Sequence, residues 1–94
     1  FNKTKFMASI RQLKKDINNE IGAIIEDIYH WELSNPKADL TKSEQLIDEA
    51  IVYFDILIQQ VNAVKGENTK KQFSSILSEK EKNIKVLLNK FAKL

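Results

Sequence analysis

The residues of this sequence best suited to chemistry lie close together in the segment Glu26-Asp27-Ile28-Tyr29-His30-Trp31-Glu32. In a helix, Glu26 lies four positions and Asp27 three positions before His30, so each carboxylate shares a helical face with the imidazole. A carboxylate and a histidine at such spacing form half of a di-metal site in some four-helix bundles. A complete site needs a second histidine, and His30 is the only one in the chain. A metal site would therefore require a symmetric dimer, whereas a histidine near a helix C-terminus is also explained by the helix dipole.

Other catalytic arrangements are missing from the sequence. It contains no cysteine and no Gly-x-Ser-x-Gly motif, and its two glycines, Gly22 and Gly66, lie too far apart to form a phosphate-binding loop. Four carboxylates have the spacing of a solvated stripe on one helix: Glu44, Asp48, Glu49 and Asp55. We therefore predict a protein that is not an enzyme and that carries no cofactor.

Lysines are concentrated in the last third of the chain, where they suggest a nucleic-acid surface. They are Lys70, Lys71, Lys80, Lys82, Lys85, Lys90 and Lys93. However, Glu79 and Glu81 interrupt this basic face, Arg11 is the only arginine, and no aromatic residues alternate with the lysines to stack on bases. The net charge of the whole chain is only +2. A solvated helix face explains the lysines better, and we predict no nucleic-acid partner.

An apolar run, Ala-Ile-Val-Tyr-Phe-Asp-Ile-Leu-Ile at residues 50–58, indicates a protein partner instead. On a helix, a narrow polar stripe is formed by Asp48, Asp55, Gln59 and Asn62. Enough apolar positions remain to face two neighbouring helices, namely Ile47, Ala50, Ile51, Phe54, Leu57, Ile58 and Val61. The surplus consists of Val52, Tyr53 and Ile56, and clustered exposed apolar groups often mark contact sites. We predict that these three residues contact a second copy of the chain, forming a homodimer, or a helix of another protein.

The apolar residues recur at helical spacing throughout, which predicts an all-α, antiparallel, up-down-up three-helix bundle. The helices are expected at about 5–33, 41–65 and 69–94, within a single domain over 1–94 and after a frayed segment at 1–5. Pro36 ends the first helix, and a capping box of Thr41 and Glu44 begins the second. Gly22, inside the first helix, predicts either a bend or the close approach of another backbone.

The third helix has an apolar seam interrupted by one charge. The seam consists of Phe73, Ile76, Leu77, Ile84, Leu87, Leu88, Phe91 and Leu94. Lys80 occupies a seam position, and we expect its stem to pack while its ammonium group reaches water. Residues 34–65 carry three basic and five acidic side chains and residues 66–94 seven and three, which favours antiparallel packing of the last two helices.

The composition is that of a soluble globular protein, with 43% hydrophobic and 30% charged residues. No apolar run approaches the roughly 20 residues of a transmembrane helix. No secretory signal is visible, and the first apolar residues already have helical spacing. We therefore expect a cytoplasmic protein without a transmembrane segment.

Two segments resemble known groups of proteins. The opening Met-Ala-Ser-Ile-Arg-Gln-Leu-Lys-Lys-Asp-Ile-Asn at residues 7–18 resembles small uncharacterised all-helical proteins of bacteria, and Met7 has the character of a natural start. This resemblance covers residues 7–94 but implies no activity. Leu-Ile-Asp-Glu-Ala at 46–50, followed by Gln60 and Val61, is similar to the middle helix of N-terminal three-helix domains of SNARE proteins. That resemblance implies regulation of membrane fusion through a bound partner helix.

Three functions therefore remain open from the sequence. The first is a small, self-associating or protein-binding module without enzymatic activity. The second is a regulatory three-helix domain of the SNARE type. The third is a dimeric metal-binding bundle that uses Glu26, Asp27 and His30.

Overall fold

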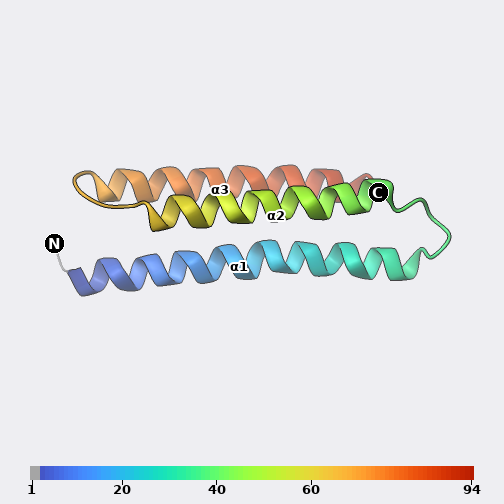
Figure 1. Cartoon of the computed structure of the whole chain (residues 1–94), viewed down its shortest axis with the longest axis horizontal. Helices are drawn as coiled ribbons and strands as arrows, with labels where there is room; N and C mark the ends of the chain where they lie inside the picture. Colours follow the sequence, from blue (N-terminus) through green and yellow to red (C-terminus); the bar gives the residue numbers. More distant parts are fainter. Residues whose placement is uncertain (1–2) are drawn as a thin grey trace.

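The protein is a rod of three antiparallel helices (Figure 1). The computed structural model describes the backbone of residues 3–94 and the side chains of residues 9–94. Helix α1 spans Lys3–Ser34, α2 spans Thr41–Asn62 and α3 spans Thr69–Ala92. The rod measures 55 × 17 × 17 Å. The predicted all-α, up-down-up three-helix bundle is confirmed.

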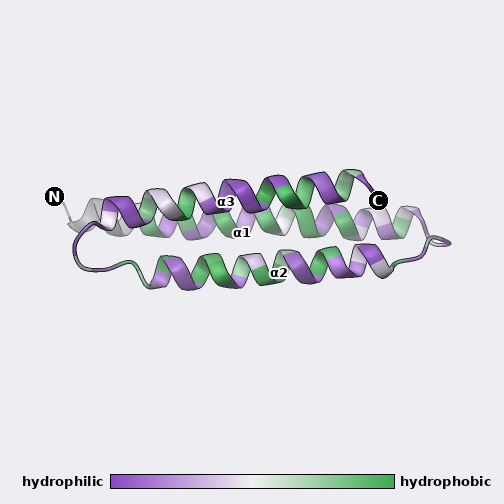
Figure 2. Ribbon diagram, turned by 90° about the horizontal axis from the view of Figure 1, so that it is seen from above, coloured by the Kyte–Doolittle hydropathy of each residue, from purple (hydrophilic) through white to green (hydrophobic). Residues whose placement is uncertain are grey.

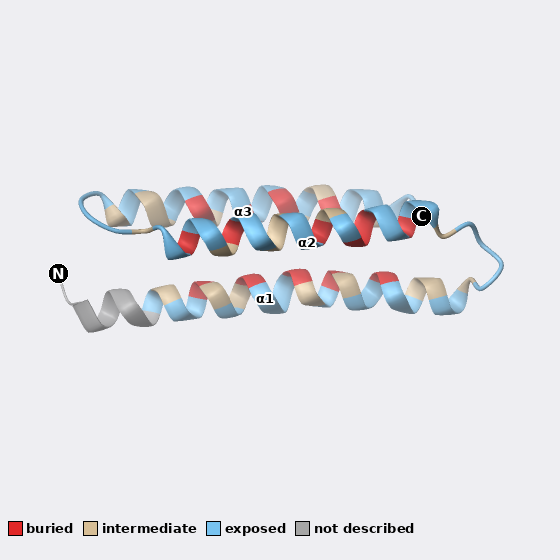
Figure 3. Cartoon of the chain, in the orientation of Figure 1, coloured by how far each residue is buried: buried red, intermediate tan, exposed pale blue. Residues whose placement is uncertain are grey.

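One narrow stripe of each helix forms the core. On α1 the buried positions follow one another at spacings of four and three residues, and Figure 3 shows them in a line along the edge that faces the other two helices. The buried apolar residues are Leu13, Ile17, Ile21, Ile24, Ile28, Leu46, Ile47, Ala50, Leu57, Val61, Ile76 and Leu87. Burying one such aliphatic side chain stabilises the fold by roughly 1.5–3 kcal/mol. Hydrophobic and hydrophilic positions consequently alternate along every helix in Figure 2.

The helix ends differ from the prediction by a few residues. The backbone is already helical at residues 3–5, which were expected to be frayed, because neither glycine nor proline interrupts the start of α1. Residues 1–2 lie outside the described part of the chain. Helix α2 ends at Asn62 rather than at residue 65, and Ala63 closes it in a right-handed conformation. Gly66 has a φ of +76°, but it supplies this left-handed conformation within the loop and not at the end of the helix.

The start of α2 is held by an aspartate two residues before the helix and not by the predicted capping box. Leu40 occupies the N-cap position without a side-chain cap, so the prediction for Thr41 and Glu44 is wrong. The carboxylate Oδ1 of Asp39 instead accepts hydrogen bonds from the hydroxyl of Thr41 at 2.7 Å and from its backbone N–H at 2.9 Å. Aspartate is well suited to this local turn because its short side chain reaches the backbone two residues ahead. The two hydrogen bonds lower the pKa of Asp39.

The loop between α2 and α3 is held by the side chain of Gln72. Its Nε2 donates to the carbonyl oxygens of Lys65 at 3.1 Å and Glu67 at 2.9 Å. Asn68, at the N-cap position of α3, has a left-handed backbone with φ 61° and makes no side-chain cap. The turn therefore depends on hydrogen bonds from the first turn of α3 and not on a side-chain cap.

Gly22 does not provide a close approach between helices of this chain. A Cβ atom built on it would meet nothing within 4 Å apart from its own helix and chain neighbours, so the predicted contact with another backbone is wrong. Helix α1 continues through this position. Since glycine inside a helix costs about 1 kcal/mol relative to alanine, Gly22 has no stabilising role within the bundle.

Candidate functional site

The residues predicted as an interface extend from the solvent-facing side of α2 to the flank that faces α3. Glu49, Val52 and Ile56 follow the i, i+3, i+7 pattern, so they share one stripe of the helix. The side chain of Glu49 forms an ion pair with Lys90 of α3, with Oε1 and Nζ 2.6 Å apart, which identifies the flank. Val52 is 51% exposed and Ile56 44% exposed. Tyr53 is half-buried and packs against the core, so it is less exposed than Val52 and Ile56.

Helix α3 adds a further apolar side chain beside this part of α2. Because Glu49 pairs with Lys90 and the helices are antiparallel, Val86 lies level with Tyr53, one turn further along each helix. Val86 is half-buried and lies outside the central core. We call this surface, centred on Val52, Ile56 and Val86, the α2–α3 face.

The α2–α3 face is positively charged at one end. A depression there is lined by Lys42, Gln45, Leu46, Glu49, Lys90, Lys93 and Leu94. The hydrogen bond with Glu49 raises the pKa of Lys90, and the second carboxylate oxygen of Glu49, Oε2, is buried without a partner. Three lysines against one carboxylate leave this end basic. The pair also confirms the predicted attraction between the acidic middle helix and the basic last helix.

Ile51 was predicted to be buried, and this prediction is wrong. Its side chain is 44% exposed. It follows Glu49 by two positions, which is about 200° around the helix, so it lies on the opposite flank of α2, towards α1. Each helix of a three-helix bundle buries only the sector between its two neighbours. Leu88 is exposed for the same reason, although it was expected in the seam of α3.

Ser43, which the sequence analysis passed over, fixes the register of α1 against α2. It is fully buried, and its hydroxyl donates to Oε2 of Glu32 at 2.5 Å. A serine close to a helix N-terminus usually predicts a capping residue, so the residue type did not indicate this contact with α1. Ile25, Tyr29 and Glu32 follow the i, i+4, i+7 pattern, and therefore Ile25 and Tyr29 lie on the flank of α1 that faces α2.

The polar cluster of Glu26, Asp27 and His30 is exposed on α1. Among the side chains that the structure describes, no group of three histidine, cysteine or acidic residues is arranged to hold a metal ion. These three residues also take no part in the α2–α3 face. The geometry of these described residues offers no support for the metal-binding alternative.

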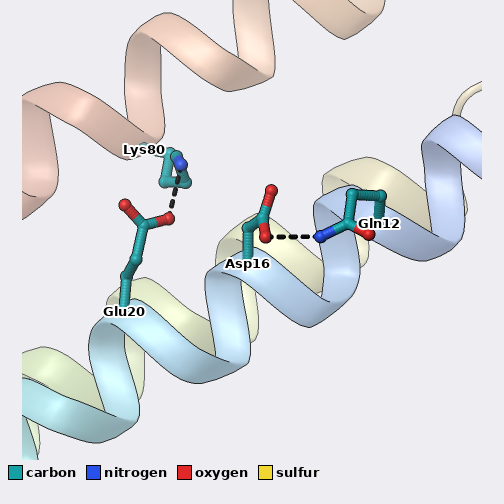
Figure 4. A network of polar contacts seen from close by, with 4 residues as sticks. All are labelled: Gln12, Asp16, Glu20 and Lys80. Atoms are coloured by element: carbon teal, nitrogen blue, oxygen red, sulfur yellow. Dashed lines mark hydrogen bonds and ion pairs between the residues drawn. The ribbon is translucent and has the colours of Figure 1, made fainter.

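The contact between α1 and α3 contains a nearly buried ion pair (Figure 4). Lys80 is 8% exposed, and its Nζ lies 2.5 Å from Oε2 of Glu20. The ammonium group was expected to reach water, and this is wrong because a carboxylate of α1 is within reach of it. One turn away on α1, Gln12 donates to Asp16 at 2.8 Å. The pair orients α3 on α1, which is a structural role.

Within the described residues, no helix is long and apolar enough to cross a membrane. Comparison of the chain with protein-family models, curated proteins and solved structures finds no match. The resemblances to bacterial helical proteins and to SNARE domains therefore remain predictions.

Proposed function

We propose that this protein is a non-enzymatic interaction module that binds an amphipathic helix of another protein along the α2–α3 face. The observation that carries the proposal is the exposure of Val52 and Ile56 side by side on α2. Val86 of α3 is half-buried and adds apolar surface on the neighbouring helix. A helix that lays its apolar stripe onto this surface removes these side chains from water.

The charges around the α2–α3 face favour an acidic partner. Lys42, Lys90 and Lys93 surround one end of the α2–α3 face. The other end is mostly uncharged, because a second depression there is lined by Gln60, Ala63, Val64, Gln72, Ser75, Ile76 and Glu79. A second copy meeting this face would bring few carboxylates to the lysines. Carboxylates on a partner helix would pair with them and speed association.

Designed helical peptides test the proposal. One peptide carries an apolar stripe and glutamates at one end, a second has lysines in place of the glutamates, and a third has a scrambled stripe. We expect fluorescence anisotropy to show binding of the first peptide, weaker binding of the second and none of the third. Ile56→Glu should weaken binding of the first peptide at least about tenfold, since a charge replaces an apolar contact.

Ile51→Glu is the matched control for this experiment. Ile51 has the same residue type and the same exposed fraction as Ile56, 44%, but lies on the other flank of α2. Binding that falls equally in both variants, or that ignores the order of the three peptides, would contradict the proposal. Among the described residues, no specific observation favours the SNARE-type alternative or the metal-binding alternative.

A further inference from the structure

The groove between α1 and α2 carries a second surface, on the opposite side of α2 from the α2–α3 face. Its α1 stripe is Arg11, Lys15, Asn18, Gly22, Ile25 and Tyr29. Its α2 stripe is Glu44, Asp48, Ile51, Asp55, Ile58 and Asn62. Both stripes have successive spacings of four, three, four, three and four positions. This repeat is that of a coiled-coil seam, so the two stripes can pack on helices of matching period. We call the two stripes together the α1–α2 face.

Apart from Asp55 in the middle of the α2 stripe, the charges of the α1–α2 face are separated along its length. The α1 stripe begins with the basic residues Arg11 and Lys15, and the α2 stripe begins with the acidic residues Glu44 and Asp48. Since α1 and α2 are antiparallel, these two charged groups lie at opposite ends of the face and cannot meet within one chain. All four side chains are exposed, and none belongs to the ion pairs found among the described residues.

A twofold axis brings the opposite charges together. An axis perpendicular to the rod reverses the direction of α1, so that α1 of one copy runs parallel to α2 of the other. The basic start of each α1 stripe then lies over the acidic start of the partner's α2 stripe, with Arg11 opposite Glu44 and Lys15 opposite Asp48. We propose that the α1–α2 face binds a second copy of this chain in this twofold arrangement.

The register within the chain places Gly22 at the centre of such a dimer. The hydrogen bond between Ser43 and Glu32 sets α2 residue 43 level with α1 residue 32. With Arg11 opposite Glu44, the twofold axis then passes close to Gly22. The space around Gly22 is open, and a residue without a side chain lets a helix of the second copy come close. The dimer thus accounts for a glycine that the isolated bundle does not explain.

The dimer also covers apolar side chains that are left in water in the single chain. Tyr29 is 49% exposed, and Ile51 lies exposed on the same face. In the twofold arrangement, Ile25 of one copy lies opposite Ile58 of the other, with Ile51 one heptad before Ile58. The α2–α3 face lies on the other flank of α2 and stays free. Self-association therefore goes beyond the proposed function and does not compete with it.

Two charge-reversed variants test this arrangement. The first carries Arg11→Glu and Lys15→Glu, and the second carries Glu44→Lys and Asp48→Lys. In each variant alone, the starts of both stripes have charges of one sign, so we expect the dimer dissociation constant to rise at least about tenfold. In an equal mixture, each basic stripe meets an acidic stripe, and we expect heterodimers. Fluorescence-detected sedimentation with one variant labelled measures both results.

The controls separate this surface from a general effect of charge or folding. Lys82→Glu with Lys85→Glu changes the net charge as much as the first variant, but on α3, and should leave the dimer intact. A chain with all four reversals restores complementarity and should dimerise again, and circular dichroism verifies that every variant is helical. Wild-type protein that stays monomeric at the highest concentrations, or mixed variants that do not associate, would overturn the proposal.

Failure of the dimer is distinguishable from failure of the proposed function. Ile56→Glu should weaken peptide binding at least about tenfold and leave the dimer unchanged. The variant with Arg11→Glu and Lys15→Glu should weaken the dimer and leave peptide binding unchanged. If Ile56→Glu weakens the dimer instead, the second copy occupies the α2–α3 face, and the assignment to the α1–α2 face is wrong.

Discussion

Ile51 and Ile56 are the same residue type on the same helix, and both are 44% exposed. They nevertheless lie on opposite flanks of α2 and among different charges. Ile51 is on the α1–α2 face, where acidic and basic residues occupy opposite ends. Ile56 is on the α2–α3 face, where lysines gather at one end around Glu49. Exposure alone therefore marks two candidate contact surfaces, and only the charges around them distinguish the proposed partners.

The different charges of the two faces indicate that a charge pattern can select a partner before any apolar contact is made. A face with separated opposite charges is complementary to itself after a twofold rotation, so it suits a second copy. A face with an excess of one sign is better suited to a different molecule with the opposite sign. Four sets of substitutions test the parts of the fold on which these two faces depend.

Leu57→Ala should have the largest effect on stability. Leu57 is fully buried between the two flanks of α2. Removing its side chain should lower the free energy of unfolding by about 2–5 kcal/mol, because a cavity remains. Ile51→Ala and Ile56→Ala should each cost less than about 1 kcal/mol, as expected for partly exposed positions. Urea denaturation measures the three values, and a large loss for either isoleucine would mean that its face belongs to the core.

Glu20→Gln tests the flank of α1 that faces α3, where the charges are already paired inside the chain. It leaves the nearly buried ammonium group of Lys80 without its carboxylate. We expect the free energy of unfolding to fall by about 1–3 kcal/mol. Lys80→Met should be tolerated much better, since an apolar side chain of similar length replaces the charge. Equal losses in the two variants would show that packing of the lysine stem, and not the ion pair, stabilises this contact.

Gly22→Ala should stabilise the isolated bundle. The glycine lies inside α1 with open space around the added methyl group, so helix propensity predicts a gain of about 0.5–1 kcal/mol. The measurement is thermal unfolding at a dilution where the chain is monomeric. Ala23→Gly, at the neighbouring exposed position, should cost a similar amount and serves as the reverse control. A loss of stability in Gly22→Ala would mean that the glycine is needed inside the fold, and would remove one argument for the dimer.

The smallest effect concerns Asp39, whose side chain holds the turn that precedes α2. Its hydrogen bonds with Thr41 lower the pKa of Asp39 in the folded state. A carboxyl group with a lowered pKa stabilises the fold above its ordinary pKa of about 4, and this contribution disappears as the pH falls through the lowered value. Asp39→Ala should therefore be slightly less stable than wild type at pH 7. The two melting temperatures should converge in strong acid, and a difference that persists there would exclude ionisation as the cause.

Much of the fold could be predicted because helical periodicity is a local property. The spacing of apolar residues in α1 corresponds directly to its buried stripe, and the polar residues around Pro36 mark the first loop. The exposure of Val52 and Ile56 followed from the same pattern, because α2 has more apolar residues than two neighbouring helices can cover. Ile51 could not be separated from the core in this way. Whether Ile51 is buried depends on the position of α1 around the axis of α2. A projection of one helix does not contain that information.

The sequence by itself determined three helices, their order, and the existence of more apolar surface on α2 than one bundle buries. These depend on residue types at short separations, where spacing translates directly into position on a helix. Only the tertiary structure decided which flank of α2 faces which neighbour. The contacts responsible are Glu49 with Lys90, Ser43 with Glu32 and Lys80 with Glu20. They join residues far apart in the chain, so the charges that distinguish the two faces come together only when the helices pack.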